Sequence, residues 1–134
     1  MAFDPATVRI MRDADVVIAR QKGREVASTV GFRGADLTII ATAISEIARN
    51  IVSYAREGDV VFSGILDGRR QGIQIVAQDK GPGIPDIAQA MRDGFSTGKS
   101  LGLGLPGARR LMDDFEIVSE VGVGATVTMR KWVP

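Results

Sequence analysis

Two short segments carry the side chains best suited to chemistry. Residues 46–50 read Glu-Ile-Ala-Arg-Asn, so a helix would present Glu46 and Asn50, four residues apart, on one face. Arg49 is expected on another side of that helix. Asp79 ends an apolar, strand-like run and precedes Lys-Gly-Pro-Gly. Solvated helix surface and an ordinary turn would explain both segments, since Asp, Gly and Pro dominate turns. The alternative is a site that holds a nucleotide, a metal ion and a hydroxyl group.

Each of these residue types has a matching role in such a site. A glutamate on a helix, Glu46, can accept a proton from a hydroxyl or a water. Asn50 offers a neutral oxygen to Mg²⁺, which keeps several waters and takes other ligands from substrate phosphates. Asp79 could accept a hydrogen bond from an exocyclic amine. Gly81 and Gly83 would let the backbone approach a flat ring closely.

A glycine-rich run, Gly-Leu-Gly-Leu-Pro-Gly at 102–107, precedes a helical pattern. Free backbone N–H groups at the start of a helix bind phosphate oxygens, and Lys99 is near enough in sequence to add positive charge. Two better-known motifs are excluded. Residues 94–100 have three residues between the glycines where a P-loop has four, and no strand precedes 102–107 as a dinucleotide fingerprint requires.

Composition limits the remaining chemistry. The chain has 134 residues, which favours a single domain over 1–134. It has no cysteine and no histidine, so disulfides, zinc–sulfur sites and imidazole catalysis are excluded. The net charge is +1, and we expect neither a nucleic-acid nor a membrane partner. No signal peptide and no long apolar run is evident, so a cytoplasmic protein is expected.

The apolar periodicity predicts two layers of secondary structure. Asp13 or Asp15 is the expected N-cap of the first helix and Asp36 that of the second. Apolar residues of the second helix extend past one stripe, so it should be covered on more than one side. The order favours an α+β sandwich with helices on one face of a mixed sheet. The expected strands cover 8–11, 59–66, 69–78, 115–120 and 126–132, and the expected helices 15–30, 36–57, 85–92 and 105–114.

Taken together, the three motifs resemble those of the GHKL ATPase/kinase superfamily. The superfamily has an acid-x-x-x-Asn helix, then an Asp-x-Gly-x-Gly turn, then a late Gly-x-Gly loop. This chain has the three motifs in the same order and with similar spacing. The runs at 19–25, 43–51 and 102–113 are similar to the small serine/threonine kinases of bacterial partner switching, the switch kinases of the stressosome. The resemblance covers nearly the whole chain, and it implies the Bergerat-type two-layer sandwich.

The resemblance also implies a role for each motif residue. Related anti-sigma kinases have an arginine in the lid before the glycine loop, where this chain has Lys99. By this resemblance, Glu46 would be the general base toward a serine or threonine hydroxyl, and Asn50 would ligate Mg²⁺. Asp79 would recognise adenine, with Gly81 and Gly83 shaping the pocket and Thr126 supporting adenine through water. Gly102 and Gly104 would contact phosphates, and residues 93–101 would form the ATP lid.

The function implied is an ATP- and Mg²⁺-dependent protein serine/threonine kinase. Its substrates would be STAS-domain proteins of the stressosome. After release from them it would bind and activate a PP2C-type phosphatase. Two alternatives remain, an anti-sigma factor kinase that sequesters a sigma factor and a non-catalytic ATP-binding interaction module.

Overall fold

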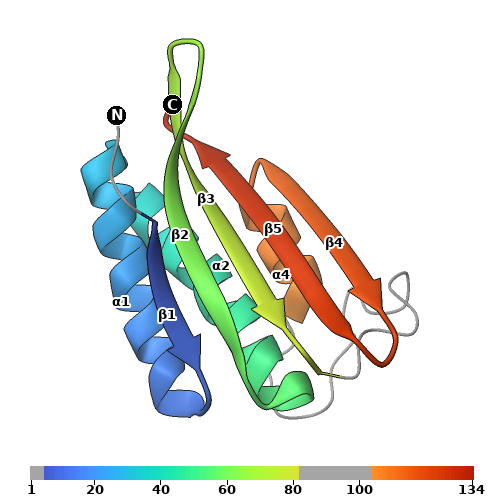
Figure 1. Cartoon of the computed structure of the whole chain (residues 1–134). Helices are drawn as coiled ribbons and strands as arrows, with labels where there is room; N and C mark the ends of the chain where they lie inside the picture. Colours follow the sequence, from blue (N-terminus) through green and yellow to red (C-terminus); the bar gives the residue numbers. More distant parts are fainter. Residues whose placement is uncertain (1–4, 82–103) are drawn as a thin grey trace.

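The computed structural model describes residues 5–81 and 104–134 as one sheet covered by helices (Figure 1). Strand β1 (Ala6–Ile10) is followed by helices α1 (Asp13–Val30) and α2 (Ala35–Asn50). A π-helical turn, η1 (Ile51–Ala55), leads into the hairpin of β2 (Gly58–Asp67) and β3 (Arg70–Asp79). Helix α4 (Gly104–Leu111) precedes a closing hairpin of β4 (Asp114–Glu120) and β5 (Gly124–Trp132).

The five strands lie in the order β1-β2-β3-β5-β4, and each neighbouring pair is antiparallel. The α+β sandwich is therefore confirmed, but the expectation of a mixed sheet is wrong in this detail. The cause is connectivity: β2–β3 and β4–β5 are hairpins, and residues after β3 return the chain so that β5 runs opposite to β3. Val60, Ala77 and Val127 are register partners and mark the face of the sheet that points to the helices.

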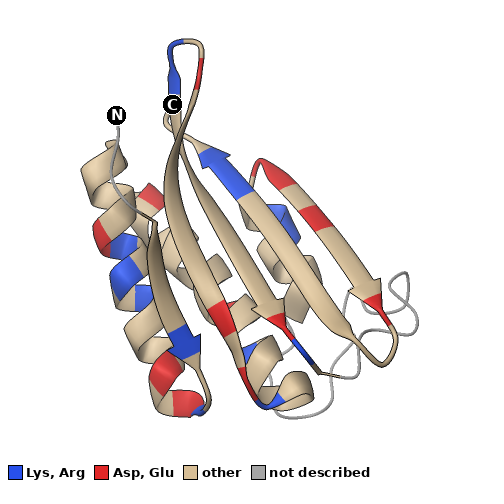
Figure 2. Ribbon diagram, in the orientation of Figure 1, with Lys and Arg blue, Asp and Glu red and all other residues tan. Residues whose placement is uncertain are grey.

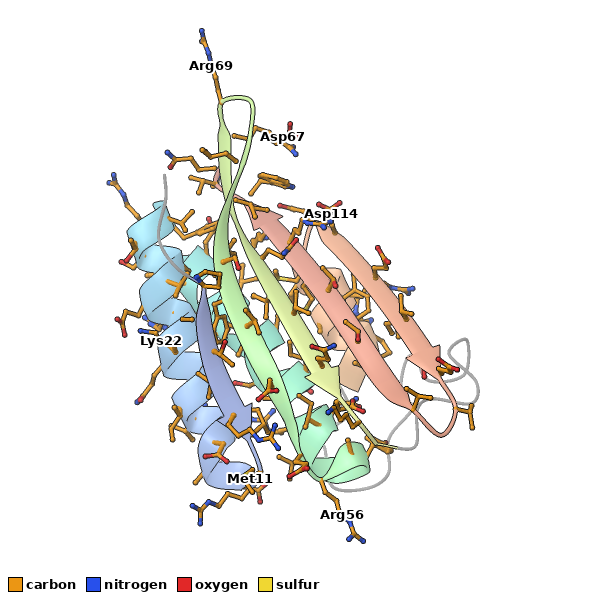
Figure 3. The ribbon with its side chains drawn as sticks, in the orientation of Figure 1. Met11, Lys22, Arg56, Asp67, Arg69 and Asp114 are labelled. Carbon is orange, nitrogen blue, oxygen red and sulfur yellow. The ribbon has the colours of Figure 1, made fainter. Side chains whose placement is uncertain are left out.

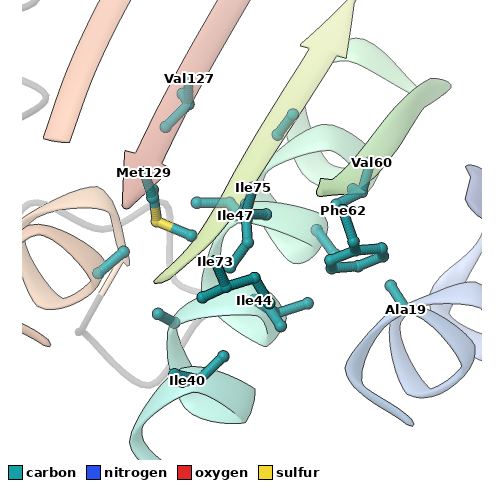
Figure 4. Packing of buried hydrophobic residues seen from close by; sticks show 14 of the residues in the cluster. Ala19, Ile40, Ile44, Ile47, Val60, Phe62, Ile73, Ile75, Val127 and Met129 are labelled. Carbon is teal, nitrogen blue, oxygen red and sulfur yellow. The ribbon is translucent and has the colours of Figure 1, made fainter. Parts of the chain in front are cut away.

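All the described helices cover that one face (Figure 1). Helix α2 lies in the middle and contacts both α1 and α4, which confirms that it is covered on more than one side. Its residues Ile44 and Ile47 meet Phe62 of β2 and Ile75 of β3 in the core, and Met129 of β5 joins them (Figure 4). The other face of the sheet carries no layer of the described residues.

The element predictions hold within a few residues, and two capping predictions are wrong. Arg12 is the N-cap of α1, and Asp15 lies at the third helical position. Its Oδ2 accepts the N–H groups of Met11 at 2.8 Å and Arg12 at 3.2 Å. Gly34 is the N-cap of α2, with Asp36 in the first turn. The expected helix over 85–92 lies outside the described residues.

Charge is distributed without one dominant sign (Figure 2). Basic and acidic residues are close together on α1, whereas the charged residues of β4 are all acidic. No helix in the described part of the chain is long and apolar enough to span a membrane.

The close approach of α1 to the core depends on Gly23. A Cβ atom there would collide with Cδ1 of Ile44 and lie 2.8 Å from Cε1 of Phe62. We expect Gly23→Ala to lower the free energy of unfolding by about 1–3 kcal/mol, because overpacking pushes α1 away from α2 and β2. Urea denaturation followed by circular dichroism measures this. An unchanged midpoint would show that Ile44 and Phe62 yield without cost.

Candidate functional site

The candidate site lies where α2 ends and β3 ends, at the lower end of the sheet in Figure 1. After Asn50 the helix widens into η1, and the N–H of Arg56 donates to the carbonyl of Ile51 at 2.9 Å. Arg56 has φ of 72° and terminates the helix, and its side chain extends into solvent (Figure 3). Single π turns are frequent at functional sites. Asn50 is half-buried directly before this turn.

Glu46 is the only buried charged side chain among residues 5–81 and 104–134, with 7% of its surface exposed. Its Oε1 pairs with Nη1 of Arg49 at 3.0 Å. Its Oε2 accepts the N–H of Gly104, the first residue of α4, at 2.9 Å. A buried carboxylate is costly unless it is paired and hydrogen-bonded, as Glu46 is. The burial excludes the interpretation of Glu46 as solvated helix surface.

One expectation for this region needs correction. Arg49 does not point elsewhere: its guanidinium group bridges back to Glu46. The Glu–Arg spacing of three residues on a helix was the signal in the sequence that indicated this contact. Gly104 donates its N–H to Glu46 in this structure, and its expected phosphate contact stays a prediction. A phosphate oxygen at this N–H would have to displace the Glu46 carboxylate.

Asp79 closes β3 on the helix-facing side of the sheet, since its register partner is Gly58 beside buried Val60. Its Oδ1 accepts the N–H of Gly81 at 2.9 Å and the N–H of Ala125 at 3.3 Å. Within the described residues, Oδ2 makes no hydrogen bond. Among the described residues the carboxylate is thus held through one oxygen, and the lone pairs of the other can accept a donor.

Glycines bring backbone segments close to Asp79. A Cβ atom on Gly81 would lie 2.6 Å from Cβ of Ala55, so the turn after Asp79 packs on the end of η1. Gly124 has φ of 147°, and a Cβ atom there would collide with the carbonyl oxygen of Asp79. A Cβ atom on Gly58 would lie 3.1 Å from both Asp79 Cβ and Ile51 Cγ2. Close packing therefore joins β3, β5 and the end of α2 into one site.

The structure does not bring the side chain of Thr126 to the Asp79 carboxylate. Its register partner is Gln78, so its side chain lies on the face of the sheet away from the helices. The residue of β5 that reaches the Asp79 carboxylate is Ala125, through its backbone N–H. Sequence reasoning missed Ala125 because the contact uses its backbone N–H, which the residue type does not reveal. The adenine role of Thr126 stays a prediction without a contact that supports it.

Other expectations for this region lie outside the described residues. They concern Gly83, Lys99 and Gly102, together with the lid over 93–101. Gly81 and Gly104 are the proposed site glycines that the structure describes: the turn at Gly81 packs on Ala55, and Gly104 donates its N–H to Glu46.

The donor set suits a metal only in combination with a ligand. In the part of the chain that the structure describes, no three acidic, histidine or cysteine side chains are grouped to hold a metal ion. Asn50 lies one helical turn after Glu46 and supplies a neutral oxygen of the kind Mg²⁺ accepts. Phosphate oxygens and waters would then complete the coordination, so the residues fit a metal bound together with a nucleotide.

Comparison with known proteins assigns the chain to a family. Residues 11–131 match the histidine kinase-like ATPase domain. Over 130 residues the chain is 49% identical to the serine/threonine-protein kinase RsbT of Bacillus subtilis strain 168, covering 97% of this chain and 98% of the relative. It is 30% identical to the anti-sigma F factor of Thermoanaerobacter sp. strain X514 over 104 residues, covering 73% of this chain and 71% of the relative.

Solved structures agree on the fold. The mycobacterial sensor histidine kinase MprB superposes with a TM-score of 0.58 at 16% identity, covering 98% of this chain and 97% of that chain. The catalytic domain of histidine kinase ThkA gives a TM-score of 0.53 at 12% identity, with 94% and 95% covered. At identities this low, the two structures show a shared fold and nothing about function. The family match and the 49% identity to a kinase over nearly the full chain show the family itself. This chain belongs to the histidine kinase-like ATPase family, as an RsbT-like serine/threonine kinase homologue.

Proposed function

We propose that this protein transfers the γ-phosphoryl group of Mg²⁺-bound ATP to a serine or threonine hydroxyl of a partner protein, with Glu46 as the general base. The observation that supports this most is the burial of Glu46 at the end of α2. A buried carboxylate held by Arg49 and by the first residue of α4 is more than an ATP-binding module needs. The identity to RsbT over 97% of the chain supports the same activity.

In the proposed reaction the substrate hydroxyl oxygen attacks the γ-phosphorus and forms the new P–O bond. The bond from the γ-phosphorus to the oxygen bridging to the β-phosphate breaks, and ADP leaves. Glu46 accepts the hydroxyl proton, which later passes to water. Asn50 would hold Mg²⁺, which neutralises phosphate charge when bound. Catalysis of this kind depends mainly on positioning and electrostatic stabilisation.

The nucleotide is proposed to bind at Asp79. Its Oδ2 would accept the exocyclic amine of adenine, while Oδ1 keeps its bonds to Gly81 and Ala125. The match to an ATPase domain over 11–131 supports ATP as the nucleotide. Gly83, Gly102, Gly104 and Lys99 complete the proposal as adenine-pocket and phosphate contacts from the sequence motifs. Thr126 remains proposed for adenine recognition on the resemblance alone.

The partners proposed are STAS-domain stressosome proteins as substrates and, after release, a PP2C-type phosphatase that the kinase activates. The identity to RsbT supports this assignment. The lower identity to an anti-sigma F factor, over 73% of the chain, leaves sequestration of a sigma factor as the second candidate. Given these partners, we also propose that the protein acts in the cytoplasm.

Incubation with Mg-ATP and a STAS-domain protein encoded near this chain tests the proposal. We expect the partner to gain one phosphate on serine or threonine, read by mass spectrometry. A parallel pull-down with a PP2C-type phosphatase and with a sigma factor separates the two candidates. ATP binding with no phosphate on any partner, together with full phosphatase activation, would favour the non-catalytic module.

A further inference from the structure

The ion pair between Glu46 and Arg49 gives Arg49 a possible function of its own, besides the proposed role of Glu46 as the base. The pair is asymmetric: the side chain of Glu46 is 8% exposed and that of Arg49 is 46% exposed. Exposed ion pairs at this helical spacing contribute little, as for Lys22 and Glu25 on α1 at 3.4 Å. Here one partner is buried, so removal of the cation would leave a carboxylate out of water with less compensation.

The two oxygens of Glu46 are held by different elements. Oε1 meets the guanidinium group of Arg49 from α2, and Oε2 meets the N–H of Gly104 from α4. If Gly104 turns its N–H to a phosphate oxygen, as the proposed phosphate role requires, the Arg49 contact alone remains among the described ones. The orientation of the carboxylate would then depend on Arg49.

We propose that Arg49 is a positioning residue, which holds the Glu46 carboxylate in the orientation needed to accept the substrate proton. This inference rests on the proposed function. A planar guanidinium group at 3.0 Å restricts both the rotamer of Glu46 and the direction of its lone pairs. A misplacement of about 1 Å in such a group lowers a rate by about a hundredfold. Arg49 acts through Glu46 and has no assigned contact with substrate.

Arg49→Ala is the direct test. With ATP and partner saturating, we expect the single-turnover rate of phosphoryl transfer to fall about tenfold to a hundredfold. ATP affinity should stay near the wild-type value, because Arg49 has no assigned contact with ATP. The melting temperature should fall, because the buried Glu46 carboxylate loses its cation. Arg49→Lys should recover part of the rate, since lysine keeps the positive charge. Recovery should be incomplete, because lysine lacks the planar, forked donor geometry of the guanidinium group.

A matched control removes another ion pair of the same sequence spacing. Asp67 and Arg70 pair at 3.5 Å, both exposed, and Asp67 lies at the opposite end of the sheet (Figure 3). Asp67→Asn should leave the rate unchanged. The positioning role is overturned if Arg49→Ala transfers phosphate at the wild-type rate. It is also overturned if the rate and the ATP affinity fall together and Arg49→Lys recovers neither of them.

A second readout does not need catalysis. The amide resonance of Gly104, followed by NMR after glycine labelling, reports its bond to Glu46 Oε2. We expect Arg49→Ala to move this resonance toward its position in Glu46→Ala, and Asp67→Asn to leave it in place. If the wild-type protein binds ATP but phosphorylates no partner, the proposed function fails. The Gly104 resonance still decides whether Arg49 holds the Glu46 carboxylate in place, and an unchanged resonance in Arg49→Ala overturns that contact.

Discussion

Glu46→Gln is expected to lower the rate of phosphoryl transfer by about 10²–10⁴-fold while ATP still binds. The amide keeps the size of the side chain and an oxygen that can accept the N–H of Gly104, now at 2.9 Å from Oε2. It cannot take a proton from the substrate hydroxyl. Single-turnover transfer to the partner and calorimetric titration with ATP measure the two effects separately.

Ser45→Ala is the matched control for this prediction. Ser45 is the neighbouring buried polar residue, and its Oγ donates to the carbonyl of Ala41 within the same helix at 3.0 Å. Its replacement perturbs the same turn of α2 without touching the Glu46 carboxylate, so transfer should continue. Full activity in Glu46→Gln would assign the proton to another acceptor and leave Glu46 a structural cap on α4.

Asp79→Asn is expected to weaken ATP binding by about tenfold to a hundredfold. The amide oxygen can still accept the N–H groups of Gly81 and Ala125, so the turn after β3 should be kept. What is lost is a charged acceptor for the exocyclic amine, worth about 1.5–3 kcal/mol. Each 1.4 kcal/mol is about a tenfold change in affinity.

Nucleotide preference makes this prediction specific. Inosine triphosphate lacks the exocyclic amine, so wild-type protein should bind ATP more tightly than inosine triphosphate, and Asp79→Asn should reduce that difference. Asp59→Asn is the control, because Asp59 lies on the opposite face of the sheet and bonds to Arg9 at 3.3 Å. If Asp79→Asn binds both nucleotides as wild type does, Asp79 shapes the turn and does not read the base.

Much of the fold could be predicted because local periodicity and long-range packing agree. The stripe that contains Ile44 and Ile47 predicted a helix with a wide buried surface, and the structure places it between two other helices. Asp67-Gly68 predicted the turn between β2 and β3. The direction of β5 could not be predicted in this way. It depends on how the chain returns to the sheet after β3.

The candidate site was predictable in its residue types and less so in its contacts. The sequence by itself determined that Glu46 and Asn50 share one helix face and that Asp79 stands at a strand end, because helical and strand spacings are local properties. It also excluded histidine and cysteine chemistry.

Only the tertiary structure decided that Glu46 is buried, that Gly104 from α4 donates to it, and that Ala125 rather than Thr126 faces Asp79. The physical reason is that burial and register belong to the packing of several elements. Gly104 lies 58 residues from Glu46, and Ala125 lies 46 residues from Asp79. No local pattern specifies contacts over such separations, which form when the helices close on one face of the sheet.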